Sequence, residues 1–539
     1  MQNNFIKDFV AEGELYLKPK GLNFAEAVKE TLNELPYNVS ITENGAIGYK
    51  SSGHALVDIN YMTSSLRQKN DNELIDMFKA AYYESPIYAW KWLFFLRDIR
   101  GGMGERDTFR RIIKNMADFR PHEMALFIPY IAEYGRYDDT WVLLDTQLNS
   151  IVIKMINAQL QEDIKNYTEA KPISLLAKWL PKRNAESHIS RHYARLIIEG
   201  LELDDKTYNR MLVKLRKKLN LVETFMCAHQ WSAIDYNSVP SKANLLYRNA
   251  FLKHDPERRQ QYLEDLANGK EGVKINATTN FPHDIVHQYV TVDGYGWSYK
   301  LKKYDETLEQ LWKNQKDTIQ SAENIMVIQD GSGSMYQPID RNSSVQAEEV
   351  ATALSIYFAE RCSGQFNNTF MTFGNIPRFV DISNCQNLKE KIQITLTNTD
   401  CSNTNIERVF QLLLDTAVKN NMKQSDLPNT LLMISDMEFD CMTSGRTDKA
   451  MFDEFAKEYE RYGYKLPRLV FWNICSRTGT IPVRENTNGV ALVSGYSVNI
   501  MNMVLNNELD PYKCLLKQLN TERYQIIEDR FKELEGKSK

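Results

Sequence analysis

The stretch from Asn324 to Met335, NIMVIQDGSGSM, constrains the fold of this chain more than any other. An apolar run of strand length ends at Asp330, and a Ser/Gly turn follows with Ser332 and Ser334 at alternate positions. Just past the carboxyl end of a buried strand, these three oxygen-bearing side chains can turn toward one point. Hard oxygen ligands of this kind suit Mg²⁺ or Mn²⁺. The stretch predicts a divalent-cation site, and a plain serine-rich turn after a strand is the alternative.

The D-x-S-x-S pattern resembles the metal-ion-dependent adhesion site of von Willebrand factor A domains. The resemblance implies a threonine from a second loop, and Thr404 directly precedes an apolar helical pattern. It also implies an aspartate after a further buried strand, and Asp436 ends the run LLMISD. Family members often have glycine next, whereas this chain has Met437, so the local loop is expected to differ. The predicted ligands of Mg²⁺ or Mn²⁺ are therefore Asp330, Ser332, Ser334, Thr404 and Asp436.

From about residue 321, apolar runs of strand length alternate with helical patterns. We expect strands at 367–374, 378–382, 430–435, 468–474 and 490–493, and helices after about 344, after Thr404 and at about 449–462. Buried strands that alternate with helices predict a mostly parallel, doubly wound, Rossmann-like sheet over residues 321–510, of the von Willebrand A type. A last helix at about 511–534 is expected to pack back on the body, within a C-terminal segment 511–539.

The first part of the chain, residues 1–320, reads as helical nearly throughout from about residue 20. Apolar residues recur at three- and four-residue spacing in 24–35, 72–83, 105–119 and 121–134. Consecutive amphipathic helices with short connections favour stacked, HEAT-like helical pairs. No clean sequence repeat accompanies them, so this prediction rests on the rhythm of the helices. The fold class predicted for the whole chain is an all-helical repeat domain followed by an α/β domain.

Four motifs in this part are long enough to be specific: FFLRDIRGGMGER at 94–106, EYGRYDDTW at 133–141, LAKWLPK at 176–182 and IDYNSVP at 234–240. They are similar to those of the family called domain of unknown function 2828. That family in turn resembles the Ro ribonucleoprotein, in which a ring of helical repeats (the TROVE module) precedes a von Willebrand A domain. The resemblance implies RNA binding without catalysis. These motifs match Ro only loosely, so no RNA-contact residue is carried over from it.

The first of these motifs places Arg97, Arg100 and Arg106 around a glycine turn. A phosphate-binding glycine loop is one interpretation, but the turn follows a helix and lacks the lysine-serine pair of such loops. A helix-turn-helix corner whose arginines pair with Asp98 and Glu105 is the interpretation that we favour.

Support for RNA within the chain itself comes from residues 171–260, which hold 17 Lys and Arg against 9 Asp and Glu. Aromatic side chains nearby could stack on bases. The alternative is a set of solvated faces and a helix, from Asp204 to Leu219, whose charges complement its dipole. The predicted RNA contacts are Lys182, Arg183, Arg191, Arg195, Lys214, Arg216, Lys217 and Lys218.

Composition limits the remaining possibilities. A net charge of −4 argues against a protein that coats nucleic acid along its whole surface. Seven scattered cysteines, no secretory signal and no apolar run of membrane-spanning length predict a cytoplasmic protein with no membrane partner. No local motif points to a catalytic residue. We therefore expect a non-enzymatic RNA-binding scaffold with a divalent-metal site, and the alternative is an adaptor that captures a carboxylate of a protein partner through the metal.

Overall fold

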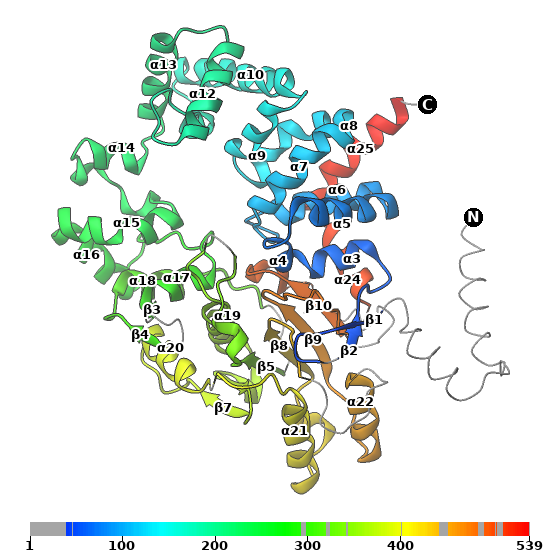
Figure 1. Ribbon diagram of the computed structural model, residues 1–539. Coiled ribbons are helices and arrows are strands. Elements are labelled where there is room, and N and C mark those ends of the chain that lie inside the picture. Colours follow the sequence, from blue (N-terminus) through cyan, green and yellow to red (C-terminus); the bar gives the residue numbers. More distant parts are fainter. Residues whose placement is uncertain are drawn as a thin grey trace, which may run out of the picture.

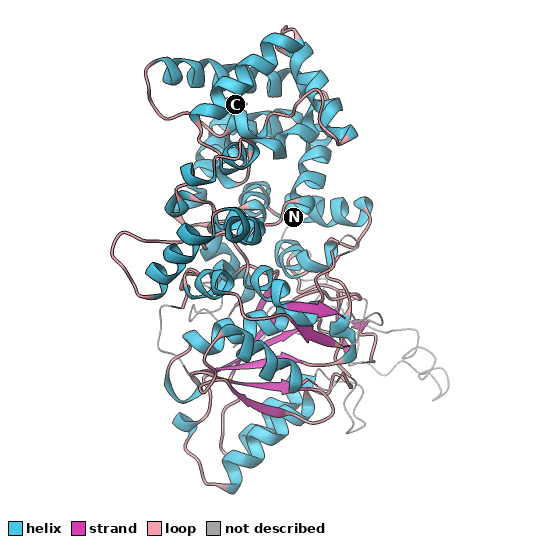
Figure 2. Ribbon diagram, turned by 90° about the vertical axis from the view of Figure 1, so that its left-hand side faces the viewer, coloured by secondary structure: helices cyan, strands magenta, loops and turns pink. Residues whose placement is uncertain are grey.

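The computed structural model describes residues 39–45, 47–292, 298–319, 324–340, 343–399, 401–440, 451–482, 490–501, 503 and 510–537. Its strands gather at one end of the molecule and its helices extend from there (Figure 2). The chain thus combines a helical part with an α/β part, as the sequence predicts. The expected helix at 24–35 lies outside the described residues.

The α/β part is built on a six-stranded sheet in the order β10-β9-β8-β5-β6-β7. Its strands are β5 (Ile325–Asp330), β6 (Thr369–Phe373), β7 (Arg378–Asp381), β8 (Thr430–Ser435), β9 (Arg468–Asn473) and β10 (Val490–Ser494). Every neighbouring pair is parallel except β6 and β7. The central strands β5 and β8 are buried at every position, which indicates that both faces of the sheet are covered. The strands expected from the apolar runs are confirmed.

Four helices accompany these strands: α19 (Ala347–Arg361), α20 (Leu388–Thr397), α21 (Glu407–Lys419) and α22 (Met451–Arg461). The helix expected after about residue 344 is α19, and its side chains are buried continuously from Ala347 to Ala359. The reason is that α19 lies between the strands β5, β6 and β8 on one side and α17 of the helical part on the other. It therefore joins the two parts of the molecule.

The helical part begins with α3 (Ala55–Tyr61), α4 (Thr63–Leu66), α5 (Asp71–Glu84), α6 (Pro86–Arg97) and α7 (Asp107–Phe119). The predicted helices at 72–83 and 105–119 are confirmed in α5 and α7. The single helix expected at 121–134 is wrong in detail: α8 (Pro121–Phe127) and α9 (Ile131–Tyr134) are separated by a 3-10 turn around Pro129. Proline has no N–H for the ladder, which explains the break.

The chain continues through α10 (Asn149–Thr168), α11 (Leu176–Trp179), α12 (His188–Gly200), α13 (Asp205–Lys218), α14 (Val222–Cys227), α15 (Ser241–His254), α16 (Pro256–Ala267), α17 (Pro282–Tyr289) and α18 (Glu306–Lys313). The helices from α3 to α18 run outward from the sheet and back toward it in an arc (Figure 1). The first end of the arc rests on the sheet through α3 and β10, and the last end rests on it through α17 and α19. The α/β part therefore bridges the two ends of the arc.

Two short hairpins interrupt the region that was expected to be helical. One pairs β1 (Val39–Ile41) with β2 (Ile47–Tyr49), and the other pairs β3 (Val290–Val292) with β4 (Tyr299–Leu301). The β1–β2 hairpin lies against the α/β part, where Tyr49 exchanges two backbone hydrogen bonds of 2.8 Å with Ile481. It belongs to the surroundings of the sheet although it precedes the helices in sequence.

The single last helix expected at 511–534 is wrong in detail: α24 (Pro511–Leu519) and α25 (Gln525–Lys537) are separated by a 3-10 turn at Glu522–Tyr524. Both helices pack back on α6, as expected for this segment. The corner motif at 94–106 is where they arrive: Arg523 pairs with the buried Asp98. Arg97 pairs instead with Asp139 at 2.7 Å, and Glu105 pairs with Arg67. The corner is held by ion pairs, but their partners lie elsewhere in the chain and not within the motif.

Among the described residues, no helix is both long and apolar enough to pass through a bilayer.

Candidate metal centre

Three loops at the carboxyl edge of the sheet carry the five predicted metal ligands. Asp330 is the last residue of β5, Thr404 precedes α21, and Asp436 follows β8, the strand next to β5. The loops are joined by backbone hydrogen bonds: Gly333 N–H donates to the Ser402 carbonyl at 3.1 Å, and Asp440 N–H donates to the Thr404 carbonyl at 3.1 Å. Parallel neighbouring strands end at one edge, so these residues lie close in space although the sequence separates them.

The turn after β5 directs its polar groups toward Asp330. The Ser332 N–H donates to Asp330 Oδ1 at 2.9 Å, and the Ser435 hydroxyl donates to Asp330 Oδ2. The hydroxyl oxygens of Ser332 and Ser334 are 3.0 Å apart. Two ligands at adjacent corners of a Mg²⁺ octahedron, with metal–oxygen distances of 2.0–2.1 Å, would be about 2.9 Å apart. The two hydroxyls are hydrogen-bonded to each other, and the same spacing would suit two neighbouring ligands of such an ion.

The loop after β8 brings in the second carboxylate. Asp436 is fully buried, and its Oδ1 accepts a hydrogen bond from the Glu438 N–H at 3.2 Å. Between them, Met437 adopts a left-handed φ of +64°, a conformation that glycine reaches without strain. The resemblance to von Willebrand A domains implies glycine at this position, and the backbone conformation here is one that glycine favours.

Thr404 lies at the edge of this group with its side chain buried. Its hydroxyl accepts a hydrogen bond of 3.2 Å from the Asn44 side-chain amide, which comes from the loop of the β1–β2 hairpin. A hydroxyl oxygen has two acceptor lone pairs, so this contact leaves one of them for another group.

The two carboxylates are close enough to perturb each other. Burial, followed by the negative charge of Asp436, raises the pKa of Asp330 to about 7. Burial also raises the pKa of Asp436, against the opposing positive charge of Arg477. A third buried carboxylate, Glu348 in the first turn of α19, has its pKa raised by burial and by Asp330. The site thus gathers three buried carboxyl groups, each with its pKa raised.

A divalent cation fits this arrangement. Asp436 Oδ2 is buried and accepts no hydrogen bond from any residue that the structure describes. Its nearest positive group is Arg477 Nη1 at 3.4 Å. The Arg477 guanidinium and the Ser334 side chain stabilise this carboxylate in part, and a divalent cation would neutralise the charge of the neighbouring Asp330 as well. Among the described residues, no cluster of three or more His, Cys, Asp or Glu side chains is arranged for metal binding; the candidate centre would instead combine two carboxylates with three hydroxyls.

Sequence reasoning missed several residues of this site. Ser435 precedes Asp436 and donates to Asp330, and Arg477 follows β9, the next strand along the same edge. Arg477 could have been found by examining the carboxyl end of every predicted strand. Asn44 and Glu43 could not, because nothing near residue 43 in the sequence indicates contact with residues almost 400 positions later.

The predicted RNA-binding residues lie apart from the metal centre, on and around α11, α12 and α13 (Figure 1). Arg216 is half-buried and donates to the carbonyls of Ala177 and Leu180 at 2.8 and 2.7 Å. Arg191 donates to the carbonyls of Ala185 and Glu186.

Two of the remaining six arginines and lysines pair with acids, since Arg183 lies 3.6 Å from Asp205 and Arg195 lies 3.9 Å from Glu199. Lys218 donates to the Ala170 carbonyl. Lys182, Lys214 and Lys217 are the exposed cations of the set without a recorded partner among the described residues. The basic region is therefore less available to an anion than its sequence indicates.

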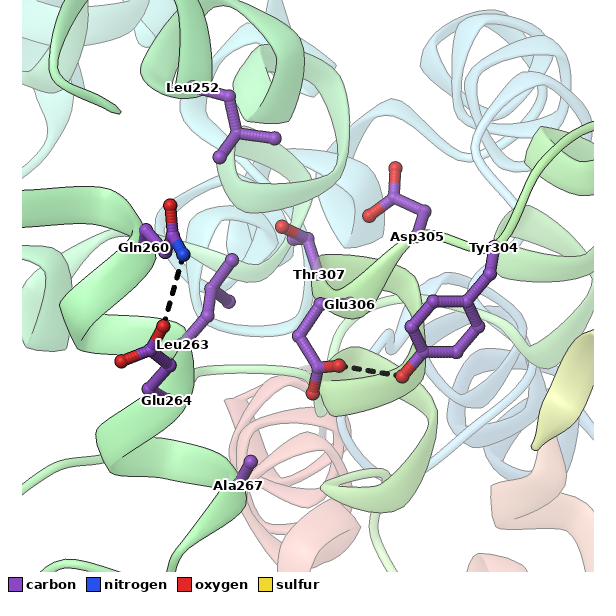
Figure 3. Close-up of a pocket in the computed structure, with 9 residues that line it drawn as sticks. All are labelled: Leu252, Gln260, Leu263, Glu264, Ala267, Tyr304, Asp305, Glu306 and Thr307. Atoms are coloured by element: carbon purple, nitrogen blue, oxygen red, sulfur yellow. Dashed lines mark hydrogen bonds between the residues drawn. The ribbon is translucent and has the colours of Figure 1, made fainter. Parts of the chain in front are cut away.

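A cavity of about 480 Å³ lies between α15, α16 and the start of α18 (Figure 3). It contains none of the predicted site residues. Its acidic side chains are already engaged: Glu264 accepts from Gln260, Glu306 from Tyr304, and Asp305 from Arg248. The three acidic side chains that line this cavity therefore already have hydrogen-bond partners within the protein.

Comparison with known proteins divides the chain near residue 324, close to the predicted boundary between the helical part and the α/β part. Residues 191–329 match the family model "Domain of unknown function (DUF2828)", and residues 324–533 match "Domain of unknown function (DUF7788)". The second match begins directly before β5 and holds all five predicted metal ligands. The chain is also 28% identical to "Uncharacterized protein L728" of Acanthamoeba polyphaga mimivirus over 530 residues, which cover 89% of this chain and 87% of the viral protein.

Proposed function

Since this chain belongs to the family of the domain of unknown function 2828, we propose a function from the chemistry of its own site: a non-catalytic binding protein that captures a carboxylate of a protein partner through Mg²⁺ or Mn²⁺. In this proposal Asp330, Ser332, Ser334 and Thr404 hold the cation directly or through water. Asp436 completes the first or second shell. The α/β part then corresponds to a von Willebrand A domain.

The observation that carries the proposal is the pair of buried carboxylates Asp330 and Asp436, with the Arg477 guanidinium 3.4 Å from Asp436 Oδ2. Two buried carboxylates repel each other, and a divalent cation between them would remove the repulsion. The mostly parallel sheet is also in keeping with the doubly wound sheet that the resemblance to von Willebrand A domains implies.

The partner group follows from the ligand chemistry. A cation held by one or two carboxylates and by neutral hydroxyls keeps positive charge and open coordination positions. When bound, it supplies a Lewis-acidic point that an outside carboxylate can occupy. Arg477, whose Nη1 lies 3.4 Å from Asp436 Oδ2, adds a second positive group at the same place. An acidic side chain of a protein is the simplest ligand that satisfies both.

The test is a calorimetric titration of the full chain with Mn²⁺. The wild type should bind about one ion, and Asp330→Asn and Thr404→Ala should bind it at least about tenfold more weakly because each loses an oxygen ligand. Ser344→Ala, a hydroxyl loss outside the five ligands, is the matched control and should bind as the wild type does. Equal Mn²⁺ uptake by all four proteins would reject the metal assignment.

RNA binding by the helical arc, as in Ro, is the second candidate function, and a specific observation favours it. The exposed Lys182, Lys214 and Lys217 belong to a segment with an excess of eight positive charges. Contacts to several phosphates would lose about a thousandfold or more in affinity between about 50 and 200 mM salt and would tolerate EDTA. A metal-bridged carboxylate would show the opposite response. Exchanging these three lysines for glutamate should weaken RNA binding and flatten its salt dependence, and unchanged binding would reject this candidate.

A further inference from the structure

The loop of the β1–β2 hairpin lies on the rim of the candidate metal centre. This hairpin tip, Thr42–Gly45, makes a row of contacts with the loop that follows Asp436. The Thr42 hydroxyl donates to the Phe439 carbonyl at 2.7 Å, and the Glu43 N–H donates to Glu438 Oε2 at 3.0 Å. The Asn44 amide donates to the Glu438 carbonyl at 2.6 Å and to the Thr404 hydroxyl at 3.2 Å. The tip therefore reaches a predicted metal ligand directly.

The hairpin tip also presents a carboxylate to the positive group of the site. Glu43 Oε2 lies 2.7 Å from Arg477 Nη2, while Nη1 of the same guanidinium lies 3.4 Å from Asp436 Oδ2. The Nε and Nη1 groups of Arg477 are buried and donate no hydrogen bond to any described residue. Nη2 is therefore the group of this arginine that receives the carboxylate of the hairpin tip, while Nη1 faces Asp436.

From these contacts we propose that the rim formed by Thr404, Glu438 and Arg477 is a receptor for an acidic turn, filled in cis by Glu43 and Asn44 and opened when an acidic turn of a protein partner takes their place. This inference rests on the proposed function and names the partner surface of the same site. The ligand class is a turn that offers one carboxylate to Arg477 and, next to it, one side-chain amide to Thr404.

The tip of the hairpin is suited to such an exchange because Glu43, Asn44 and Gly45 are exposed. The base of the hairpin stays attached to the α/β part, where Tyr49 and Ile481 exchange two backbone hydrogen bonds of 2.8 Å. The contacts of Glu43 and Asn44 with the rim are hydrogen bonds and one ion pair, which an equivalent turn in trans can reproduce.

The experiment uses the full chain and a fluorescent peptide with the sequence of residues 39–49, VSITENGAIGY, in Mg²⁺. Replacing Glu43 by Gln and Asn44 by Ala in the same chain weakens the hairpin in cis but leaves the rim intact. This double variant should bind the peptide at least about tenfold more tightly than the wild type does. Ile41→Thr, an exposed change on the same hairpin, is the matched control and should behave as the wild type. A peptide with glutamine in place of its glutamate should bind neither protein.

Adding Arg477→Gln to the double variant should abolish peptide binding, because the receptor then lacks its guanidinium. Amide hydrogen exchange checks the mechanism without any substitution: excess peptide should speed exchange at residues 39–45 of the wild type while that of α5 stays unchanged, which also shows that the fold is intact. Equal peptide affinity of the wild type and the double variant, or no peptide binding by either, would overturn the inference.

Mn²⁺ titration of the same proteins separates the two proposals. Peptide exchange without Mn²⁺ binding would leave the acidic-turn receptor in place and reject the metal function. Mn²⁺ binding without peptide exchange would do the reverse.

Discussion

Met437 adopts a left-handed backbone conformation in the turn after Asp436, and only 1% of the residue is exposed. Met437→Gly would relieve about 1 kcal/mol of backbone strain but would lose about 2–3 kcal/mol of apolar burial. We therefore expect this variant to be less stable by about 1–2 kcal/mol, as measured by urea denaturation. Met437→Ala keeps the strained φ and loses most of the same burial, so it should be less stable still. A glycine variant more stable than the wild type would contradict this reasoning.

His283 gives the chain a predictable response to acid. Its ring stacks on Phe281 and meets Tyr496 edge-on, and burial lowers its pKa to about 4. In the unfolded chain its pKa is about 6.5, so its contribution is complete above pH 6.5 and is lost as the pH falls toward 4. The loss is about 3 kcal/mol. His283→Phe should flatten the fall in unfolding free energy in this window.

His287, one helical turn later, is the matched control for that measurement. Its hydrogen bond to Glu349 raises its pKa, so its contribution is present below pH 6.5 and is lost as the pH rises through the raised value. His287→Gln should therefore cost stability at low pH and little at high pH. The same pH profile for both variants would contradict the assignment of opposite shifts.

At the scale of the elements, Arg216 of α13 is a residue whose sequence context predicts an RNA contact but whose side chain stabilises the packing of a neighbouring helix. Arg216 satisfies two carbonyls at the carboxyl end of α11, which would otherwise lack donors. Arg216→Gln should therefore lower the free energy of unfolding by about 1–3 kcal/mol, as measured by denaturant titration. Lys217→Gln, on an exposed position of the same helix, should change it by less than about 0.5 kcal/mol. Similar effects of the two variants would show that Arg216 is not needed for the packing of α11.

Every strand of the sheet except the edge strand β7 could be predicted as an apolar run that is buried along nearly its whole length, and β8 matches its predicted bounds. The positions of Asp330 and Asp436 followed from the ends of β5 and β8, whereas Thr404, which lies between α20 and α21, came from the resemblance to von Willebrand A domains. The hairpin β1–β2 could not be predicted, since three-residue strands carry no alternation long enough to detect. The partner of Arg97 could not either: Asp98 is its neighbour in sequence, but Asp139 is its partner in space.

At the scale of the whole molecule, the last helices fasten the helical part. Asp98 in the corner after α6 is fully buried and is paired with Arg523, with a further hydrogen bond of 3.1 Å from the Tyr524 hydroxyl. Arg523→Ala leaves that carboxylate without its counter-charge and should lower the free energy of unfolding by about 2–4 kcal/mol. Adding Asp98→Asn removes the stranded charge and should recover part of the loss. Two additive losses in thermal denaturation would contradict this ion-pair explanation.

The contacts that join the two ends of the chain also set the order in which it can mature on the ribosome. The hydrogen bond of Thr42 cannot form until Phe439 has been synthesised, and the ion pair of the buried Lys91 in α6 cannot form until Glu528 in α25 has been synthesised. At about 5–20 residues per second, roughly 20–80 s of synthesis separate the members of each pair. The side chains of α6 from Ala89 to Arg97 are all buried in the folded protein. During that interval α6 is not yet covered by α24 and α25, which pack against it in the folded protein. Such a nascent chain is expected to depend on chaperones that shield apolar surface until its last helix has left the exit tunnel.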